Sequence, residues 1–208
     1  KFRALNFNDL DEKHGSITSM IDFGDEGIHT IQQYKVRFDP INRDIVEGAS
    51  GGQLVIGTSK VLGNGGYYLG FDNGSQHIRT VKYHNGICYF VDGKKKEVVM
   101  FGSKGQSLKT ISKVGAMSYF NTLLNDVIDE KNLMGIIDPA QNSNDYWIIK
   151  HSQDKQDIIK YSAELEGFTS NIVCNKIFNG VYSGKELYLL GDSIAYEAYT
   201  GDKMGYLM

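Results

Sequence analysis

The 208-residue sequence is poor in proline, cysteine and tryptophan, with 2 Pro, 2 Cys and 1 Trp. The two isolated cysteines, Cys88 and Cys174, supply no spacing for a zinc site. A disulfide between them stays open, but each lies in an apolar run, and two buried free thiols are the simpler interpretation. No apolar run approaches the ~20 residues that a membrane helix needs, so we expect no membrane partner. There is also no secretory signal pattern.

The sequence also lacks an excess of positive charge, because its formal net charge is −3. A chain with this charge has no general attraction to a phosphate backbone, so we expect no sequence-specific nucleic-acid partner. One basic run, Lys94-Lys95-Lys96, lies between two apolar stretches. We interpret it as a solvated hairpin tip rather than a nucleic-acid contact.

Glycine and aromatic residues are abundant instead, with 24 Gly, 13 Tyr and 10 Phe. Aromatic side chains suit half-buried strand faces, and glycine supplies tight turns. Short apolar runs alternate with Gly, Asn and Asp turns, for example at Ile28, Ile31 and residues 34–38 before Asp39-Pro40. This pattern predicts an all-β, mainly antiparallel fold made of β-propeller-like meander units.

The clearest meander is predicted over residues 80–102, where Asn85-Gly86 is a favoured pair for a two-residue hairpin turn. Similar units follow along the chain. Their aromatic anchors Tyr89, Trp147 and Tyr188 lie roughly 58 and roughly 41 residues apart, near the period of propeller blades. One such unit cannot cover its own apolar face, so we expect neighbouring units to stack on it.

One segment departs from the β pattern, at residues 116–129. Its apolar positions have the 3.6-residue spacing of an amphipathic helix: Met117, Phe120, Leu123, Leu124, Val127 and Ile128. Ser112 is the candidate N-cap, and Asn132 or Gly135 is the candidate C-terminal stop. We predict this helix as an insertion in the β fold.

The predicted domain organisation has two parts. Residues 1–47 form an N-terminal β-rich segment, with the alternative that it belongs to a neighbouring domain. Residues 48–208 form the propeller-like β domain. Because the chain begins at Lys1 without a Met, we expect a segment of a longer protein, whose propeller-like domain is incomplete without the rest of the chain.

Groups that could carry catalysis or bind a metal are scattered. The five histidines include no i,i+4 pair: His14, His29, His77, His84 and His151. The acidic residues Asp22, Asp25 and Glu26 could bind a hard cation, but they do not fit a known calcium loop, and a solvated turn is preferred. We therefore predict no metal site.

Catalytic and cofactor motifs are missing as well. The glycine clusters at residues 48–52 and 63–66 lack the Lys-Ser or Lys-Thr of a phosphate-binding loop, so we interpret them as turns. Gly-x-Ser-x-Gly is absent, and so is the sialidase-type repeat Ser-x-Asp-x-Gly-x-Thr-Trp. We predict no catalytic residue, no cofactor and no enzymatic activity. The paired carboxylates of a glycosidase stay open, since their pairing is spatial.

A series of motifs runs in one consistent order over roughly residues 50–205. They are Gly66-Tyr-Tyr-Leu-Gly-Phe-Asp-Asn-Gly74, Ile87-Cys-Tyr-Phe-Val-Asp92, Thr110-Ile-Ser-Lys-Val-Gly-Ala-Met-Ser-Tyr-Phe120, Gly135-Ile-Ile-Asp-Pro139, Gly167-Phe-Thr-Ser170, Gly184-Lys-Glu-Leu-Tyr188, Glu197 and Thr200-Gly-Asp202. Taken together, these motifs resemble the muzzle or tail-stabilisation proteins of crAss-like podoviruses. Residues 1–47 contribute little to the resemblance.

The resemblance implies a structural protein of the virion tail. Such proteins are large, multi-domain components of a short phage tail, with propeller-like β domains around a DNA channel that they form or close. The implied partners are other tail proteins, copies of the chain in a ring, and other segments of the same gene product. The resemblance brings no catalytic residues with it.

Physical chemistry agrees with such a role. Exposed Tyr and Phe supply contact area between subunits, and an acidic net charge suits a conduit that does not retain DNA. Two alternatives stay open. One is a carbohydrate- or receptor-binding β domain of a phage or bacterial surface protein, since sugars stack on Tyr and Trp. The other is a hydrolase of cell-surface polymers on a β scaffold.

Overall fold

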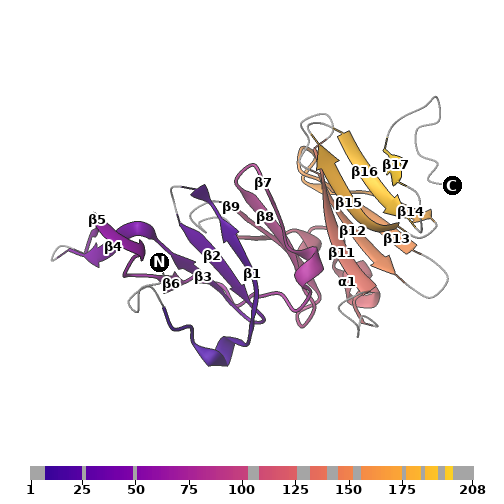
Figure 1. Cartoon of the computed structure of the whole chain (residues 1–208). Helices are drawn as coiled ribbons and strands as arrows, with labels where there is room; N and C mark the ends of the chain where they lie inside the picture. Colours follow the sequence, from indigo (N-terminus) through magenta and orange to yellow (C-terminus); the bar gives the residue numbers. More distant parts are fainter. Residues whose placement is uncertain are drawn as a thin grey trace. The chain divides into compact units, whose positions relative to one another are not determined.

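The computed structural model describes residues 8–24, 27–48, 51–102, 108–125, 132–139, 145–151, 156–174, 177–183, 186–191 and 195–198 (Figure 1). Most of this regular structure is antiparallel β-sheet, with one α-helix among the described residues, which confirms the all-β prediction. The chain forms two compact units. Unit 1 comprises Lys1–Gln76 and Phe101–Leu108, and unit 2 comprises His77–Met100 and Lys109–Met208. No helix in the described part of the chain is long and apolar enough to cross a membrane.

Unit 1 contains a four-stranded sheet in the order β1-β2-β3-β6. Its strands are β1 (Ile17–Asp22), β2 (Ile28–Gln32), β3 (Val36–Asp39) and β6 (Tyr67–Tyr68), preceded by the short 3-10 turn η1 (Glu12–His14). The strands predicted around Ile28 and Phe38 are therefore present. The core side chains are aliphatic and aromatic: Ile21, Phe23, Ile31, Val36, Phe38, Leu69 and Phe101.

A second, two-stranded sheet in unit 1 consists of β4 (Ile41–Glu47) and β5 (Gln53–Leu62). Pro40 separates it from β3, in agreement with the expected interruption at Asp39-Pro40. The predicted turn at residues 48–52 is confirmed where it is described, because the Gly48 N–H donates to the Gly52 carbonyl at 2.7 Å. The predicted boundary between residues 47 and 48 lies at the tip of this hairpin, whereas the compact units divide after Gln76.

The first sheet of unit 2 is a meander in the order β10-β9-β8-β7. Its strands are β7 (Lys82–His84), β8 (Ile87–Asp92), β9 (Glu97–Gly102) and β10 (Lys109–Thr110), and the last two residues of β9, Phe101 and Gly102, belong to unit 1. The meander predicted over residues 80–102 is therefore confirmed. Asn85 and Gly86 have φ values of 47° and 78°, as the predicted two-residue hairpin turn requires. The lysine run also forms a turn, in which the Lys95 N–H donates to Asp92 Oδ1 at 3.0 Å.

Two further sheets of unit 2 follow in chain order. The first contains β11 (Leu133–Asp138), β12 (Asp145–His151), β13 (Gln156–Ser162) and β14 (Gly167–Cys174), and the second contains β15 (Ile177–Ser183), β16 (Glu186–Gly191) and β17 (Ala195–Glu197). The predicted anchors Tyr89, Trp147 and Tyr188 lie on β8, β12 and β16, the second strands of three successive sheets. The repeat inferred from the sequence is thus a repeat of antiparallel sheets.

The β11–β14 sheet is covered on both faces. Side chains alternate between the two faces of a strand. On one face, Tyr146 and Ile148 of β12 pack in a cluster with Tyr89 of β8. The Tyr89 and Tyr146 rings stack there, with their centroids 4.9 Å apart. Trp147 and Ile149 point to the other face, into a cluster with Leu187 and Leu189 of β16. Figure 1 shows β15 and β16 lying over this sheet.

The predicted helix is present but shorter than expected. α1 spans Met117–Leu123 and buries Phe120 and Leu123 in the cluster with Tyr89. It ends at Leu124, whose N–H donates to the Phe120 carbonyl at 2.9 Å. Val127 and Ile128 lie outside the described residues.

The predicted helix ends were wrong. Ser112 does not cap α1, because it lies in the 3-10 turn η5 (Ile111–Lys113) and its hydroxyl accepts the Val98 N–H at 3.0 Å. Ala116 holds the N-cap position instead. Asn132 and Gly135 do not stop the helix either, since the helix has ended before them and Gly135 lies in β11.

Candidate interaction surfaces

The two histidines of unit 1 lie in different environments. The His14 ring is 4.5 Å from the Tyr68 ring, whereas His29 is fully buried. Three phenylalanine rings surround His29 at centroid distances of 4.4, 5.1 and 5.3 Å: Phe23, Phe38 and Phe101. Both His29 ring nitrogens are without a hydrogen-bond partner among the described residues, and burial lowers the pKa of His29 to about 4. His29 is therefore a neutral core residue.

The three histidines of unit 2, His77, His84 and His151, lie in different environments. His77 is buried, His84 Nδ1 lies 3.3 Å from the Tyr182 hydroxyl, and His151 Nδ1 lies 2.5 Å from Gln156 Nε2. Within the described ranges, no group of three or more His, Cys, Asp or Glu side chains could hold a metal ion.

The acidic turn and the cysteines were the other residues considered for metal binding or a disulfide. Asp22 Oδ1 accepts the Gly24 N–H at 2.7 Å in an exposed turn, while Asp25 and Glu26 lie outside the described residues. Cys88 is a buried free thiol, and burial raises its pKa well above the ordinary value. The side chain of Cys174 lies outside the described residues.

The first strands of three successive sheets meet in unit 2. β11 contacts both β7 and β15, and all six of its residues are buried. Gly180 allows β15 to lie close to β11, and Gly135 allows η3 (Ile78–Thr80) and the Tyr146 ring to lie close to β11. A Cβ at Gly135 would lie 2.6 Å from the Tyr146 hydroxyl and 2.9 Å from the Thr80 carbonyl, and a Cβ at Gly180 would overlap the Ile136 side chain.

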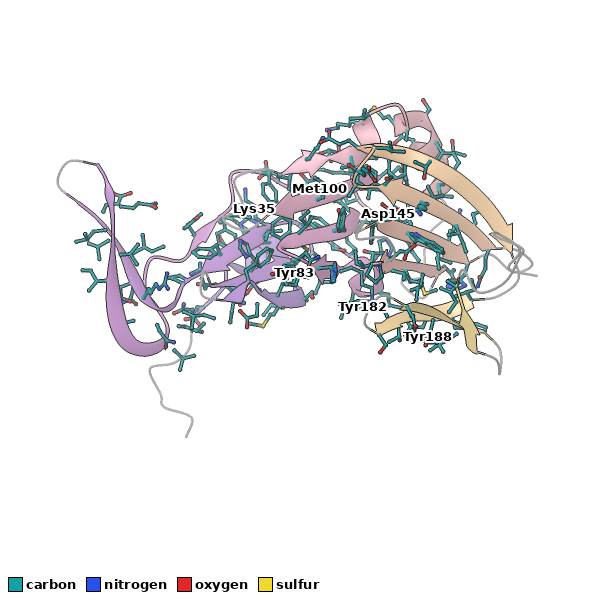
Figure 2. All side chains as sticks on the ribbon, turned by 90° about the horizontal axis from the view of Figure 1, so that it is seen from above. Lys35, Tyr83, Met100, Asp145, Tyr182 and Tyr188 are labelled. Carbon is teal, nitrogen blue, oxygen red and sulfur yellow. The ribbon has the colours of Figure 1, made fainter. Side chains whose placement is uncertain are left out.

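Aromatic and basic side chains gather where these strands meet. The His84 and Tyr182 rings contact edge to face at 5.2 Å, and Tyr83 and Tyr182 are both exposed (Figure 2). Arg79, in the 3-10 turn η3 (Ile78–Thr80), donates to the Phe178 carbonyl of β15 at 2.6 Å. Burial and the neighbouring Arg79 lower the pKa of Lys82. β7 and β15 thus each expose a tyrosine, Tyr83 and Tyr182, and two partly buried basic residues, Arg79 and Lys82, lie in the same part of unit 2.

The β15–β17 sheet has one covered and one partly exposed face. Leu187 and Leu189 point to the β11–β14 sheet, so the alternating residue Tyr188 points to the opposite face. Val181 pairs with Tyr188 and is exposed. Tyr89 of the β7–β10 sheet packs against the β11–β14 sheet, and Trp147 of the β11–β14 sheet packs against the β15–β17 sheet. Tyr188 occupies the same position in the β15–β17 sheet.

The β4–β5 arm, residues 41–62, exposes apolar side chains on both faces (Figure 2). Its exposed aliphatic residues have 45–57% of their surface accessible: Val46, Leu54, Val55, Ile56 and Val61. Because successive strand residues point to opposite faces, Leu54, Val55 and Ile56 leave neither face polar. A two-stranded hairpin is only marginally stable in water by itself. The arm therefore has the properties of a contact surface.

The features considered in the sequence did not identify the β4–β5 arm as an interaction surface. The available signal is an uninterrupted apolar triplet in a strand with no charged residue between Gln53 and Thr58. A strand with one solvated face would alternate apolar and polar residues instead.

Comparison with known proteins gives one family. A family model described as Crassvirus muzzle protein matches residues 1–185. The match includes residues 1–47, to which the motifs found in the sequence did not extend. No curated protein matches the chain.

Proposed function

The chain belongs to the Crassvirus muzzle protein family, and we propose that its β-sheets form or close part of the channel through which DNA leaves the phage. Membership of this family makes the chain a structural component of the virion tail. We propose that it acts there without catalysis, in contact with other tail proteins and with copies of itself in a ring.

The observation that supports a channel role is the meeting of β7, β11 and β15 in unit 2. In a propeller-like body, sheets are arranged radially and one edge strand of each sheet lies nearest the central channel. Contact between the first strands of three successive antiparallel sheets supports such an arrangement. We therefore propose that the exposed tyrosines on two of these strands, Tyr83 of β7 and Tyr182 of β15, lie on the channel side.

The face of the β15–β17 sheet that carries Val181 and Tyr188 supports continuation of the stack. The corresponding anchors Tyr89 and Trp147 are covered by a following sheet. We propose that a further sheet covers Tyr188 in the same way. It is supplied by another part of the same gene product or by another copy in the ring.

The channel role can be tested in assembled virions by attaching a bulky group to the proposed channel side. Tyr83→Cys would be labelled with a polyethylene glycol maleimide, and Leu165→Cys would serve as the control. Leu165 is exposed in the turn between β13 and β14, far along its sheet from the first strand β11. Labelling at residue 83 should slow DNA ejection strongly without reducing adsorption to the host, whereas labelling at residue 165 should leave ejection unchanged. Equal ejection from both labelled virions would contradict the channel role.

A further inference from the structure

We propose that two copies of the chain associate through β5. In this arrangement β5 pairs antiparallel with β5 of a second copy, about a two-fold axis at Val55, and creates a four-stranded sheet across the interface. This interface lies on the β4–β5 arm of unit 1. It does not rest on the channel role proposed for the sheets of unit 2.

The two strands of the arm differ in charge. In the described part of the chain, β5 pairs with β4 alone. The other edge of β4 is partly occupied, because the Ile45 N–H donates to the Asn64 carbonyl at 3.0 Å. β4 carries Arg43, Asp44 and Glu47, whereas residues 53–58 of β5 carry no charge. Charged residues protect an edge strand from pairing with another chain, and long uncharged β-branched edges invite it. β5 is therefore the edge suited to pairing.

The register of the arm favours pairing of β5 with β5 of a second copy. Ile45 pairs with Val55 and Val46 pairs with Leu54. A two-fold axis at Val55 places Val55 opposite Val55 of the second copy, and Leu54 opposite Ile56. One face then gains a row made only of aliphatic residues, with the order Ile45, Val55, Val55, Ile45. Such cross-strand aliphatic pairs are the unit of sheet stabilisation.

A second copy of the chain is a partner that can stabilise the arm. A sheet of three or more strands with an apolar face is stable where a lone hairpin is not, and the second copy supplies two strands at once. After pairing, both outer strands are β4, with Arg43, Asp44 and Glu47 at the edges. Association therefore closes at two copies, as an isologous interface does. Pairing through β4 would instead bring these charged residues of the two copies together.

The experiment is sedimentation equilibrium of the full 208-residue chain over a range of concentrations. We expect a monomer–dimer equilibrium. Val55→Lys places two ammonium groups opposite each other at the axis, and like charges directly opposite destabilise a strand pair. We expect this substitution to raise the dimer Kd at least tenfold, with an unchanged circular dichroism spectrum because Val55 is exposed.

The matched control is Val114→Lys. Val114 is 59% exposed in unit 2, so the same change in charge and size there should leave the dimer Kd within twofold of the parent. A chain that stays monomeric at all concentrations, or a dimer that Val55→Lys and Val114→Lys weaken equally, would overturn the proposal. A monomeric chain that binds only another tail protein through β5 would overturn it as well.

The register has its own test by oxidation of single-cysteine variants. Val55→Cys brings two thiols together at the axis and should give a disulfide-linked dimer, with the parent chain as the background. Val61 lies on the same strand, is also exposed, and is six residues from the axis. Val61→Cys should therefore give little disulfide-linked dimer. Equal yields of linked dimer from the two variants would reject the proposed register.

Discussion

The β11–β14 sheet and the β4–β5 arm are built from the same kinds of residue but have opposite surroundings. Every residue of β11 is buried, whereas no described side chain of β4 or β5 is. The sheet is covered because other sheets of unit 2 pack on each face. The arm has two strands and no covering layer among the described residues. Burial in this chain is therefore decided by neighbouring layers rather than by the apolar content of a strand.

The comparison is sharpest for isoleucine, because Ile148 is fully buried and Ile56 is 47% exposed. Ile148→Ala removes three carbon atoms from the cluster between two sheets and leaves a cavity. We expect it to lower the free energy of unfolding by about 2–5 kcal/mol, the range for buried Ile→Ala substitutions. Urea denaturation followed by circular dichroism measures this directly. A loss below about 1 kcal/mol would show that the sheet is not tightly covered.

His29 allows the comparison to be made inside unit 1, between its covered core and its uncovered arm. Burial lowers the pKa of His29 to about 4, against an ordinary value of 6.5. Between these two values the unfolded chain binds a proton that the folded chain does not, so stability falls as the pH is lowered through this window. The full loss is on the order of 3 kcal/mol, and stability above pH 6.5 is unaffected by this group.

Urea titrations at several pH values from 7 to 4 would measure the effect of His29. His29→Phe removes the titrating ring and keeps an aromatic group beside Phe23, Phe38 and Phe101, so the acid sensitivity of unit 1 should become much smaller. His84→Gln, a substitution in unit 2, is the control and should preserve the acid sensitivity of unit 1. If His29→Phe leaves the pH dependence unchanged, the loss of stability has another origin.

Two glycines provide a smaller contrast between covered and uncovered strands. A Cβ at Gly135 would lie within 3 Å of the Tyr146 ring and the Thr80 carbonyl, whereas a Cβ at Gly57 has nothing within 4 Å. Tyr146 cannot yield easily, because its hydroxyl donates to the Thr80 carbonyl at 2.6 Å and its ring stacks on Tyr89. We expect Gly135→Ala to destabilise the chain by about 1–3 kcal/mol.

Gly57→Ala is the matched substitution on the arm. It should be neutral or should stabilise by up to about 1 kcal/mol, since alanine loses less backbone entropy than glycine on folding. Thermal denaturation of both variants at low protein concentration compares them. Equal melting temperatures would mean that β11 and η3 do not approach as closely as the structure shows.

Local features of the fold could be predicted from the sequence. Asn85-Gly86 specifies its hairpin because both positions adopt positive φ. The anchors Tyr89, Trp147 and Tyr188 mark three successive sheets because each is flanked by turn residues. These signals depend on a few adjacent residues, so no knowledge of the tertiary structure is needed to interpret them.

Features set by distant residues could not be predicted. Ser112 is a residue type that caps helices, but its hydroxyl accepts the N–H of Val98, which lies on β9. The contact of β15 with β11 depends on close approach at Gly180, and the contact of η3 with β11 depends on close approach at Gly135. A strand pattern does not reveal which glycines face another segment. The exposure of Leu54, Val55 and Ile56 was also missed, because a continuous apolar run is equally compatible with a buried strand.

The smallest expected effect is that of Ile56→Ala on the arm, the counterpart of Ile148→Ala. At a concentration low enough to keep the chain monomeric, Ile56 contacts mostly solvent, and we expect a change within about 0.5 kcal/mol in the free energy of unfolding. The same substitution should weaken the dimer, because Ile56 lies opposite Leu54 of the second copy in the proposed pairing. Urea denaturation at low concentration and sedimentation at high concentration separate these two effects. A large loss of stability in the monomer would mean that the arm is already covered within one chain, and the contrast between the arm and the β11–β14 sheet would then be lost.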